Sequence, residues 1–494
     1  MVARGRIDML IGIDVGTTAI KAALYDQKGN VLKSFSERYA TARPAAGQVE
    51  QNPDDWIRLV VSAFKSLSES LPTGGIKAIG LCSQVNTHVF VDESGNALMP
   101  AMTWQDGRCA EEALKLDAQV SEAEKLAWWG APLPIDASHV LARMAFIANH
   151  RPDIWRKTRW VMAPKDYCIM RLTGNVATDP MTSFGIVDGR LTKIRQLIDL
   201  VPGAELRLPP LAGFTEVVGT IRNGLPCAGS PMVTGAMDAW SGMLGAGVCD
   251  EGQCVYLSGS SEILGIVSSR KAPTPGVIAF PKCAGITLHA GPTQSGGASV
   301  EWLSRLLSRA PHEISALAGL ADTKLPLPVF LPHLEGERAP LWDIKARASF
   351  SGISSAMGAP ELARALLEGV GYSARLVLAA LEASAYCKPE IINHSGGGAS
   401  SDIWCQIRAD ILARPINRTK LRDAGVLGSA IMAGVGVGIF PSLSDATKEF
   451  VKFDKLFEPD PAERERHAET FALYQSLYQQ LIPFNAALKP PTRS

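Results

Sequence analysis

The stretch "MLIGIDVGTTAIKAALYD", residues 9–26, places a polar turn between two apolar runs. Met9–Val15 and Thr18–Tyr25 have the composition of two strands joined as a hairpin, and the turn that begins at residue 14 reads DVGTT. A strand that only packs in a core has no use for an aspartate, a glycine and two threonines at its end. We therefore expect this turn to face a ligand.

The segments that follow predict an α/β protein. Val31–Tyr39 continues the meander, and Asp54–Leu71 has a proline just before it, as expected at the start of a helix. "IKAIGLCSQV", residues 76–85, has the composition of a buried strand. Further along, the apolar run of "SPMVTGAMDAWSGMLGAG" meets Asp238, where we expect a helix of small residues to begin.

The hairpin with a glycine-and-hydroxyl turn occurs again about half a chain later. "QCVYLSGSSEILGIVSSR", residues 253–270, predicts a strand, a turn of glycine and hydroxyl residues, and a second strand. The repeat predicts two halves of similar construction, residues 1–250 and 251–494, each offering one polar turn to a shared cleft. A third glycine cluster, "HSGGGASSDIWCQIRADIL" from His394, leads into a helix.

The composition is typical of a globular protein with large cores. The 494 residues include 49 Lys and Arg and 49 Asp and Glu, so the formal net charge is zero. A neutral balance gives no electrostatic case for nucleic acid or an anionic membrane as a partner. The longest apolar stretch, "GSAIMAGVGVGIF" from Gly428, is too short and too rich in glycine to span a bilayer.

The cysteines and the first residues predict a cytoplasmic protein. The nine cysteines are scattered without a CxxC pair, which favours free thiols over disulfides or zinc. The eight histidines show no HExxH pattern, so we expect no structural metal site. The first strand begins almost at once, with no signal-peptide layout before it.

The glycine turns suit the recognition of phosphate. Glycine lets backbone N–H groups approach a phosphate closely, and hydroxyls add further donors. Asp14 would repel a phosphate unless Mg²⁺ lies between them, and Lys21 could add a cation nearby. Each glycine taken alone is better explained as a simple turn, and Asp14 as a turn-capping residue, but three such turns, two of them in matching hairpins, weaken that explanation. The chain contains neither GxxxxGK[ST] nor a strand–GxGxxG–helix unit, which argues against P-loop and dinucleotide folds.

Several motifs, taken in order, resemble the FGGY family of carbohydrate kinases. They are "GIDVGTTAIK" (12–21), "WQDGRCAEE" (104–112), "PKDYCIMRLTG" (164–174), "FLPHLEGERAP" (330–340), "RALLEGVGYSARLVL" (364–378) and "GGGASSDIWCQIRADIL" (396–412). The resemblance implies an α/β protein with the two-domain actin/hexokinase-type (ribonuclease H-like) ATPase fold and a cleft between the domains. It also implies ATP, Mg²⁺ and phosphorylation of a sugar or polyol, with a homodimer as one candidate assembly.

The same resemblance assigns the residues around the nucleotide and the general base. Asp14 would serve the metal. The residues expected to contact the nucleotide are Gly16, Thr17, Thr18, Lys21, Gly259, Ser260, Gly297, Glu301, Gly397, Gly398 and Asp402. Asp238 would be the general base, although the residues alone favour an N-cap for the helix that follows, and the two roles can coexist.

On the sugar side the chain departs from the family pattern. The residues expected to contact the sugar are Gln84, Asn86, Trp104, Asp106 and Asp238. Xylulokinases carry a GQMHG-like segment where this chain has "SQVNT", and glycerol kinases place Arg-Glu there. Asp106 and Arg108 could instead form a structural ion pair, and Trp104 could pack in the core.

Spacing along the chain is most similar to xylulokinases, which predicts D-xylulose or a related pentulose as the acceptor. A polyol kinase that acts on glycerol, erythritol or a similar acceptor is the alternative. An ATP-binding conformational protein without catalytic activity, like actin or the heat-shock ATPases, is a further reading from a different class. The WQDGR and LEGVGY segments favour the enzyme.

Overall fold

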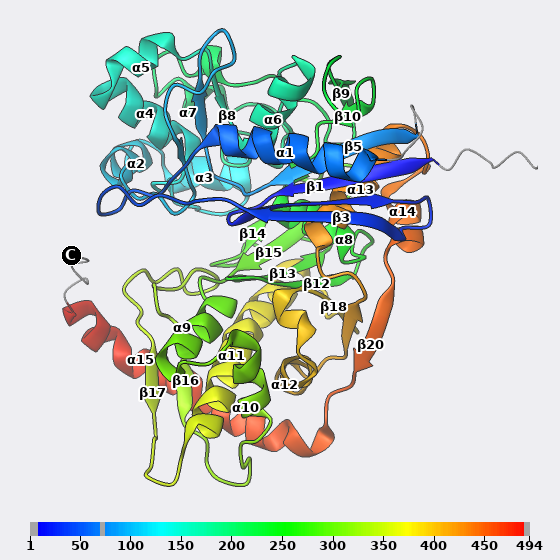
Figure 1. Cartoon of the computed structure of the whole chain (residues 1–494). Coiled ribbons are helices and arrows are strands. Elements are labelled where there is room, and N and C mark those ends of the chain that lie inside the picture. The colour runs from blue at the N-terminus through cyan, green and yellow to red at the C-terminus, as the bar shows by residue number, and fades with distance from the viewer. Residues whose placement is uncertain (1–7, 70–74, 489–494) are drawn as a thin grey trace, which may run out of the picture. The chain divides into compact units, whose positions relative to one another are not determined.

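Each of the two seven-stranded sheets in the computed structural model is built around one of the two predicted hairpins (Figure 1). The structure describes residues 8–69 and 75–488. The chain divides into two compact units. The first comprises residues up to Gly245 together with Phe280–Cys283 and Asp423–Val451, and the second comprises the other residues.

The sheet of the first unit has the order β3-β2-β1-β5-β10-β9, with β11 pairing beside β5. Its strands are β1 (Met9–Val15), β2 (Ala19–Tyr25), β3 (Val31–Arg38), β5 (Ile76–Ser83), β9 (Val217–Thr220), β10 (Pro231–Val233) and β11 (Ala236–Met237). β1, β2 and β3 form an antiparallel meander, whereas β5 runs parallel to β1, and both β10 and β11 run parallel to β5. The carboxyl ends of β1, β5 and β11 therefore meet at one edge of this sheet.

Helices cover both faces of this sheet. α1 (Pro53–Ser68) and α6 (Pro164–Thr173) pack on one face, where Trp56 and Phe64 are fully buried. α13 (Ala424–Gly436) packs on β1 and β5 and against α8 (Asp238–Gly245). Only glycine allows this close approach, because a Cβ atom would clash with the facing backbone. A Cβ at Gly12 of β1 would lie 1.9 Å from Val426 O of α13, and one at Gly428 of α13 would lie 1.8 Å from Ser241 O of α8. The apolar, glycine-rich stretch from Gly428 is thus a helix buried within the unit.

The second sheet repeats this plan in the order β14-β15-β13-β12-β18-β19-β20. Its strands are β12 (Cys254–Ser258), β13 (Glu262–Val267), β14 (Ile278–Ala279), β15 (Leu288–Pro292), β18 (Ile392–Gly396), β19 (Ile416–Thr419) and β20 (Phe453–Phe457). β12, β13 and β15 form the antiparallel meander, and β18 runs parallel to β12 and β19 to β18. In each sheet, the first strand of the hairpin therefore has its antiparallel partner on one side and a parallel strand on the other: β5 beside β1, and β18 beside β12.

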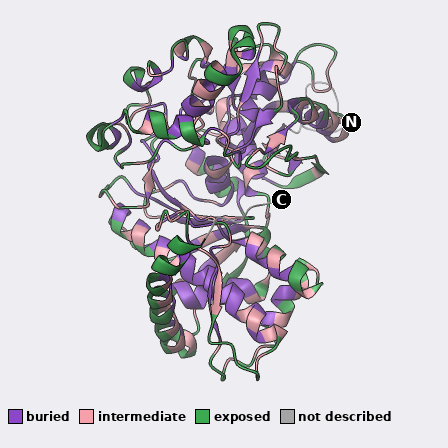
Figure 2. Ribbon diagram, turned by 90° about the vertical axis from the view of Figure 1, so that its left-hand side faces the viewer, coloured by how far each residue is buried: buried purple, intermediate pink, exposed green. Residues whose placement is uncertain are grey.

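The helices of the second unit enclose two apolar clusters. α11 (Ala359–Ala385) and α12 (Asp402–Leu412) pack against the sheet, and the second cluster joins them to three more helices. Those helices are α9 (Gly297–Leu307), α10 (Pro311–Ala318) and α15 (Arg464–Ala487). Figure 2 shows buried residues lining the strands and the inner faces of these helices, and exposed residues on their outer faces.

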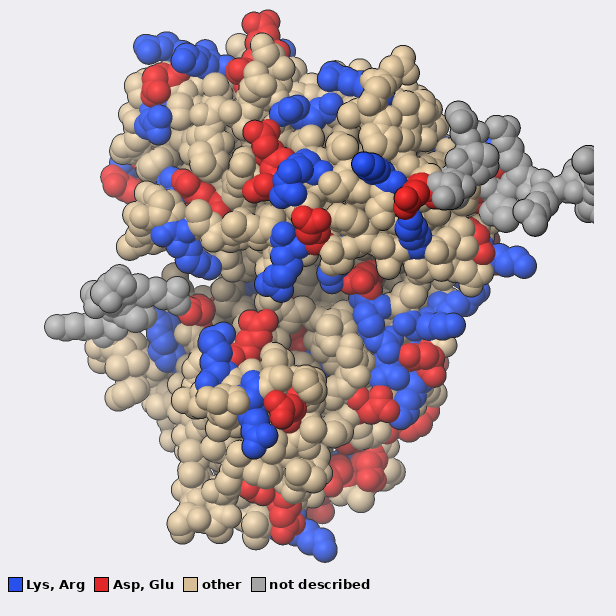
Figure 3. All heavy atoms as spheres, in the orientation of Figure 1, with Lys and Arg blue, Asp and Glu red and all other residues tan. Residues whose placement is uncertain are grey.

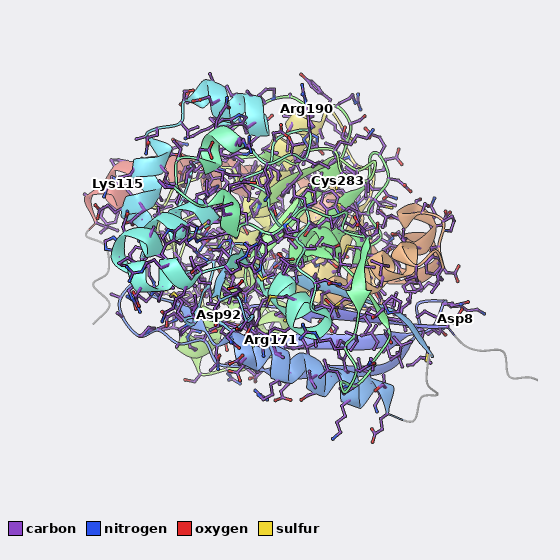
Figure 4. All side chains as sticks on the ribbon, turned by 90° about the horizontal axis from the view of Figure 1, so that it is seen from above. Asp8, Asp92, Lys115, Arg171, Arg190 and Cys283 are labelled. Atoms are coloured by element: carbon purple, nitrogen blue, oxygen red, sulfur yellow. The ribbon has the colours of Figure 1, made fainter. Side chains whose placement is uncertain are left out.

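The remaining elements are short. In the first unit they are β4 (Glu50–Gln51), β6 (Val89–Val91), β7 (Ala101–Met102), α2 (Ala110–Asp117), α3 (Glu122–Trp129), α4 (Val140–His150), α5 (Pro152–Lys157), β8 (Trp160–Met162), α7 (Arg195–Ile198), η1 (Glu205–Arg207) and α14 (Leu443–Phe450); in the second they are β16 (Val329–Leu331), β17 (Ser349–Ser351), η2 (Gly397–Ser400) and η3 (Pro461–Glu463). Asp92, labelled in Figure 4, closes the turn after β6: Asn96 N donates to its Oδ1 at 2.8 Å.

The predicted elements agree with the structure except at some ends. β1 has the predicted bounds, β2 begins one residue later than Thr18, and β3 ends one residue before Tyr39. α1 ends at Ser68, and residues 70–71 of the predicted helix lie outside the described residues. A boundary at residue 250 alone would place Asp423–Val451 in the second half, whereas this segment packs in the first unit.

On the face shown in Figure 3, basic and acidic side chains are interspersed, as the balanced composition suggests. Across residues 8–69 and 75–488, no helix combines the length and the apolar character needed to cross a membrane. All nine cysteines lie in these ranges, and no disulfide joins them.

Candidate active site

The turn after β1 places a buried carboxylate beside a helix start. Asp14 Oδ1 is buried and accepts no hydrogen bond from any residue that the structure describes. A Cβ at Gly425, in the first turn of α13, would lie 3.1 Å from Asp14 Oδ2. Burial raises the pKa of Asp14 to about 6, against the opposing effects of the Cys82 thiol and the Lys21 ammonium. A buried carboxylate oxygen without a partner is costly unless a cation or donor completes it.

This oxygen fits Mg²⁺, which prefers hard oxygen ligands and keeps several waters. Within the described ranges, no group of three or more His, Cys, Asp or Glu side chains could hold a metal ion. A magnesium ion that arrives with a phosphate ligand needs only one or two protein carboxylates.

Lys21 lies opposite Asp14 in the β1–β2 register, but its ammonium is engaged. Lys21 Nζ donates to Asp423 Oδ1 at 2.6 Å, and both side chains are about half exposed. An exposed ion pair of this kind contributes little free energy and is easily rearranged. The pairing leaves Lys21 able to turn toward a phosphate at small cost.

Thr17 is linked to two of the residues predicted to contact the sugar. Trp104 Nε1 donates to Thr17 Oγ1 at 3.1 Å, and Gln51 Nε2 donates to Thr17 O at 2.7 Å. Gln84 Nε2 in turn donates to Gln51 Oε1 at 2.7 Å, and Gln84 N donates to Val15 O at 3.1 Å. The structure therefore brings the predicted sugar residues Gln84 and Trp104 to the predicted phosphate turn.

Asn86 lies in a turn just beyond β5 and lines a cavity of ≈ 40 Å³ inside the first unit. Its φ of 54° is in the left-handed region, which asparagine tolerates better than most residues. Asn86 Nδ2 donates to Ser138 Oγ at 3.1 Å. The same cavity is lined by His139, Asp166 and Thr182, and Thr182 Oγ1 is buried without a hydrogen-bond partner among the described residues.

Asp106 has protein partners at both carboxylate oxygens. Arg108 Nη2 donates to Asp106 Oδ2 at 2.6 Å, Arg108 N donates to Oδ1 at 3.1 Å, and Val49 N donates to Oδ2 at 2.7 Å. Arg108 also donates to Glu50 Oε1 at 2.7 Å. This geometry fits the alternative of a structural ion pair that shapes the loop after Trp104.

Asp238 is the first residue of α8 and follows β11, whose Met237 lies opposite Ser83 at the end of β5. Ala239 N donates to Asp238 Oδ1 at 2.8 Å, so the carboxylate meets the helix N-terminus, where the helix dipole favours its ionised form. The side chain remains partly exposed, unlike the flanking Met237. Asp14, Gln84 and Asp238 thus end three neighbouring strands at one edge of the first sheet.

A buried ion cluster that sequence reasoning missed supports this edge. Lys165 Nζ donates to Asp166 Oδ1 at 2.6 Å and lies 2.8 Å from Asp179 Oδ2, and all three side chains are almost fully buried. Lys165 Nζ also donates to Thr234 O at 3.2 Å, just before β11. The PKDY motif carried the lysine and one aspartate, but nothing in the sequence indicated the contact with Asp179.

In the second unit, the turn after β12 is joined to the start of α9. Gly297 N donates to Gly259 O at 2.9 Å, and Ala298 N donates to Ser260 O at 3.0 Å. A Cβ at Gly297 would lie 2.6 Å from Gly259 O, so only glycine allows this approach. The two predicted nucleotide segments therefore form one backbone surface. Glu301 follows on α9 and is exposed.

The third glycine cluster lies against the same turn. A Cβ at Gly398 would lie 2.3 Å from Ser258 Oγ, whereas one at Gly397 has no atom closer than 4.0 Å. Asp402 begins α12, and its carboxylate accepts hydrogen bonds from Arg418 and, at 2.6 Å, from Lys455. Lys455 and Arg418 hold the pKa of Asp402 below its usual value. The flat surface of glycines suits a planar base, while Asp402 already has two cationic partners.

Residues 9–245 match the N-terminal domain of the FGGY family of carbohydrate kinases, and residues 254–437 match its C-terminal domain. The chain belongs to the FGGY family of carbohydrate kinases. It is an ATP-dependent sugar kinase, and the fold predicted from the motifs is confirmed.

Relatives match this kinase along its whole length. Xylulose kinase of Escherichia coli (strain K12) is 29% identical over 496 residues, which cover 97% of this chain and 100% of that protein. Among solved structures, gluconate kinase from Lactobacillus acidophilus has a TM-score of 0.87 at 27% identity, covering 97% of this chain and 99% of that one. Xylulose kinase from the same organism has a TM-score of 0.87 at 27% identity, covering 96% and 98%.

Proposed function

We propose that this sugar kinase transfers the γ-phosphoryl group of ATP to a hydroxyl of D-xylulose or a related pentulose. The observation that supports a pentulose is the full-length match to xylulose kinases, at 29% identity for the protein of Escherichia coli. The "SQVNT" segment, with Asn86 where xylulokinases carry histidine, departs from their pattern. The acceptor is therefore proposed to be a pentulose, whose preferred stereoisomer can differ from that of xylulokinases.

Asp238 is proposed as the general base. Its carboxylate follows β11 at a helix N-terminus and stays partly exposed, so an acceptor hydroxyl can reach it. The ionised form is the one that accepts a proton, and the helix N-terminus stabilises that form. Phosphoryl transfer depends mainly on positioning and charge stabilisation, but the attacking hydroxyl must still lose its proton. The buried Lys165 cluster, through Thr234 O, fixes the strand that carries the base.

Asn86, Gln84 and Trp104 are proposed to hold the sugar. An amide offers a donor and an acceptor, which suits a pair of hydroxyls better than a charged group. Gln84 Oε1 is buried and lacks a hydrogen-bond partner among the residues described, so it has an acceptor to offer. The indole of Trp104 provides an apolar face for the carbon side of a sugar.

Asp14 is proposed to hold Mg²⁺ that arrives with the nucleotide, together with Thr17 and Thr18 of the same turn. When bound, the metal would neutralise charge on the phosphates during transfer. Gly16 would let the backbone approach the phosphates, and Lys21 would add a cation by leaving Asp423. Gly259, Ser260, Gly297, Glu301, Gly397, Gly398 and Asp402 are proposed as the nucleotide contacts of the second unit.

An aldonate such as gluconate is a second candidate acceptor. The gluconate kinase structure matches this chain with the same TM-score and identity as the xylulose kinase structure. Lys193 lines the cavity beside Asn86 and could face a carboxylate, although Asp166 lines it too. Because the two structures match this chain equally well, the choice between a pentulose and an aldonate is made by experiment.

The test is ADP release from MgATP with D-xylulose, L-xylulose, D-ribulose, gluconate and glycerol under identical conditions, with Asp238→Asn as the inactive control. We expect the highest kcat/KM with a pentulose. A kcat/KM for gluconate above that of every pentulose would establish the second candidate. Turnover of glycerol alone would contradict both and favour a polyol kinase.

A further inference from the structure

A buried ion pair lies directly behind the glycine turns of the second unit. Arg408, on α12, and Glu262, the first residue of β13, are both fully buried and 146 positions apart in the chain. Arg408 Nη2 donates to Glu262 Oε1 and, at 2.8 Å, to Ser258 Oγ. Ser258 Oγ donates to the same carboxylate oxygen at 2.7 Å. The pair therefore joins the helix that follows the third glycine cluster to the turn that contains Gly259.

The pair also contacts the backbone of the third cluster. Arg408 Nη1 donates to Gly398 O at 3.1 Å. A Cβ at Gly398 would lie 3.1 Å from Arg408 Nη2 as well as against Ser258, and a Cβ at Gly296 would lie 2.6 Å from Glu262 Cγ. The glycine segments at residues 296–297 and 398 thus pack on one guanidinium–carboxylate pair, and Gly259 directly follows Ser258, which bonds to both members of the pair.

Neutral groups complete this cluster. Tyr256 OH donates to Glu262 Oε2, and His394 Nδ1 lies 2.9 Å from Tyr256 O. Burial, with the nearby Arg408 charge, lowers the pKa of His394 well below its usual value, so the imidazole is neutral. The guanidinium lies over the Trp404 ring, 3.8 Å from its centroid. The single negative charge of Glu262 is therefore balanced by the single positive charge of Arg408.

We propose that Arg408 is a positioning residue for ATP. It neutralises the Glu262 carboxylate behind the phosphate turn, and its own hydrogen bonds to Ser258 Oγ and Gly398 O, which Glu262→Gln leaves in place, join the two segments. This inference rests on the proposed nucleotide site of the second unit. An uncompensated carboxylate there would repel the nucleotide phosphates, because charges interact strongly when they are removed from water.

Two single substitutions separate this role from a purely structural ion pair. Arg408→Met leaves a buried negative charge, whereas Glu262→Gln leaves a buried positive charge, and both break the same pair. A structural role predicts that both weaken ADP binding alike. The proposed role predicts opposite effects, with the Kd for ADP raised by at least about tenfold in Arg408→Met and unchanged or lowered in Glu262→Gln.

The experiment is calorimetric titration of ADP into the parent protein and these variants, with a thermal melt of each. Arg414→Met is the matched control, because it breaks another Arg–Glu pair of the second unit, with Glu382 at 2.9 Å. We expect its Kd for ADP to equal that of the parent.

If Arg408→Met does not fold, the outcome rests on Glu262→Gln and on the double variant Glu262→Gln/Arg408→Met, which buries no net charge. Weaker ADP binding in Glu262→Gln, by more than about threefold, would overturn the proposal. So would an unchanged Kd in a folded Arg408→Met protein. The proposed pentulose acceptor fails separately, by absence of turnover with every pentulose in a parent that binds ADP.

Discussion

The two hairpin turns differ in how their carboxylates are held. In the first unit, Asp14 is partly buried, its buried Oδ1 lacks a hydrogen-bond partner within the described ranges, and burial raises its pKa to about 6. In the second unit, Glu262 is fully buried, and Arg408, Ser258 and Tyr256 all donate to it. The same strand–turn–strand plan therefore carries an incomplete carboxylate in one unit and a completed one in the other.

This difference suggests that the two carboxylates have different roles. An incomplete buried carboxylate is costly in the free protein and is stabilised by a cation that arrives with the ligand. A completed carboxylate gains nothing from a further cation, because its charge is already balanced within the protein. We therefore expect substitutions at the acidic groups of the first sheet edge to act on turnover, and substitutions in the second unit to act on the affinity for ATP.

The largest effect is expected for Asp238→Asn. Asparagine keeps most of the helix-capping ability of aspartate but cannot accept the proton, so kcat should fall by at least about a hundredfold. The melting temperature and the Kd for ADP should stay near those of the parent. A variant that turns over at the parent rate would show that Asp238 is only a helix cap. It would also contradict the expectation that the acidic groups at the first sheet edge control turnover.

A smaller effect is expected for Asn86→Ala. Loss of the amide should raise KM for the best sugar by about tenfold or more, equivalent to about 1–3 kcal/mol, because hydroxyls of the bound sugar lose their partner. KM for ATP should not change, since Asn86 lines a cavity of the first unit that none of the proposed nucleotide residues lines. The control is Thr182→Val, a substitution in the same cavity lining. Equal sugar KM values for parent and Asn86→Ala would exclude Asn86 from the sugar site.

The smallest effect is expected for Asp402→Asn. Its carboxylate is engaged by Arg418 and Lys455 and is about half exposed, and such ion pairs contribute little. KM for ATP should change by less than about fivefold, with kcat unchanged. A much larger rise in KM would show that Asp402 bonds the base directly, as the family resemblance suggests.

The local elements were readable from the sequence, and the long-range pairings were not. β1 and its turn follow from alternation and from turn-forming residues, which act over a few positions. α13 could be recognised as a helix, but its place in the first unit depends on Gly12 and Gly80 of the sheet, more than 300 positions away.

The ion pairs show the same limit. In the sequence, neither the glutamate that follows "SGSS" nor the arginine within "IWCQIRADIL" indicates a partner for the other. Only the fold shows that Glu262 and Arg408 meet. The roles of Asp14 and Asp238 came from the family resemblance and stay predictions, because a carboxylate at a strand end is equally a turn or helix cap.

The dependence of activity on free Mg²⁺ tests the contrast between the two turns most directly. Initial rates at saturating ATP and sugar would be measured for the parent, Asp14→Asn and Glu262→Gln as free Mg²⁺ is varied. The account predicts a lower maximum and a midpoint shifted to higher Mg²⁺ by about tenfold or more for Asp14→Asn, and a parent-like curve for Glu262→Gln. A parent-like midpoint for Asp14→Asn, or an equal shift for Glu262→Gln, would contradict it.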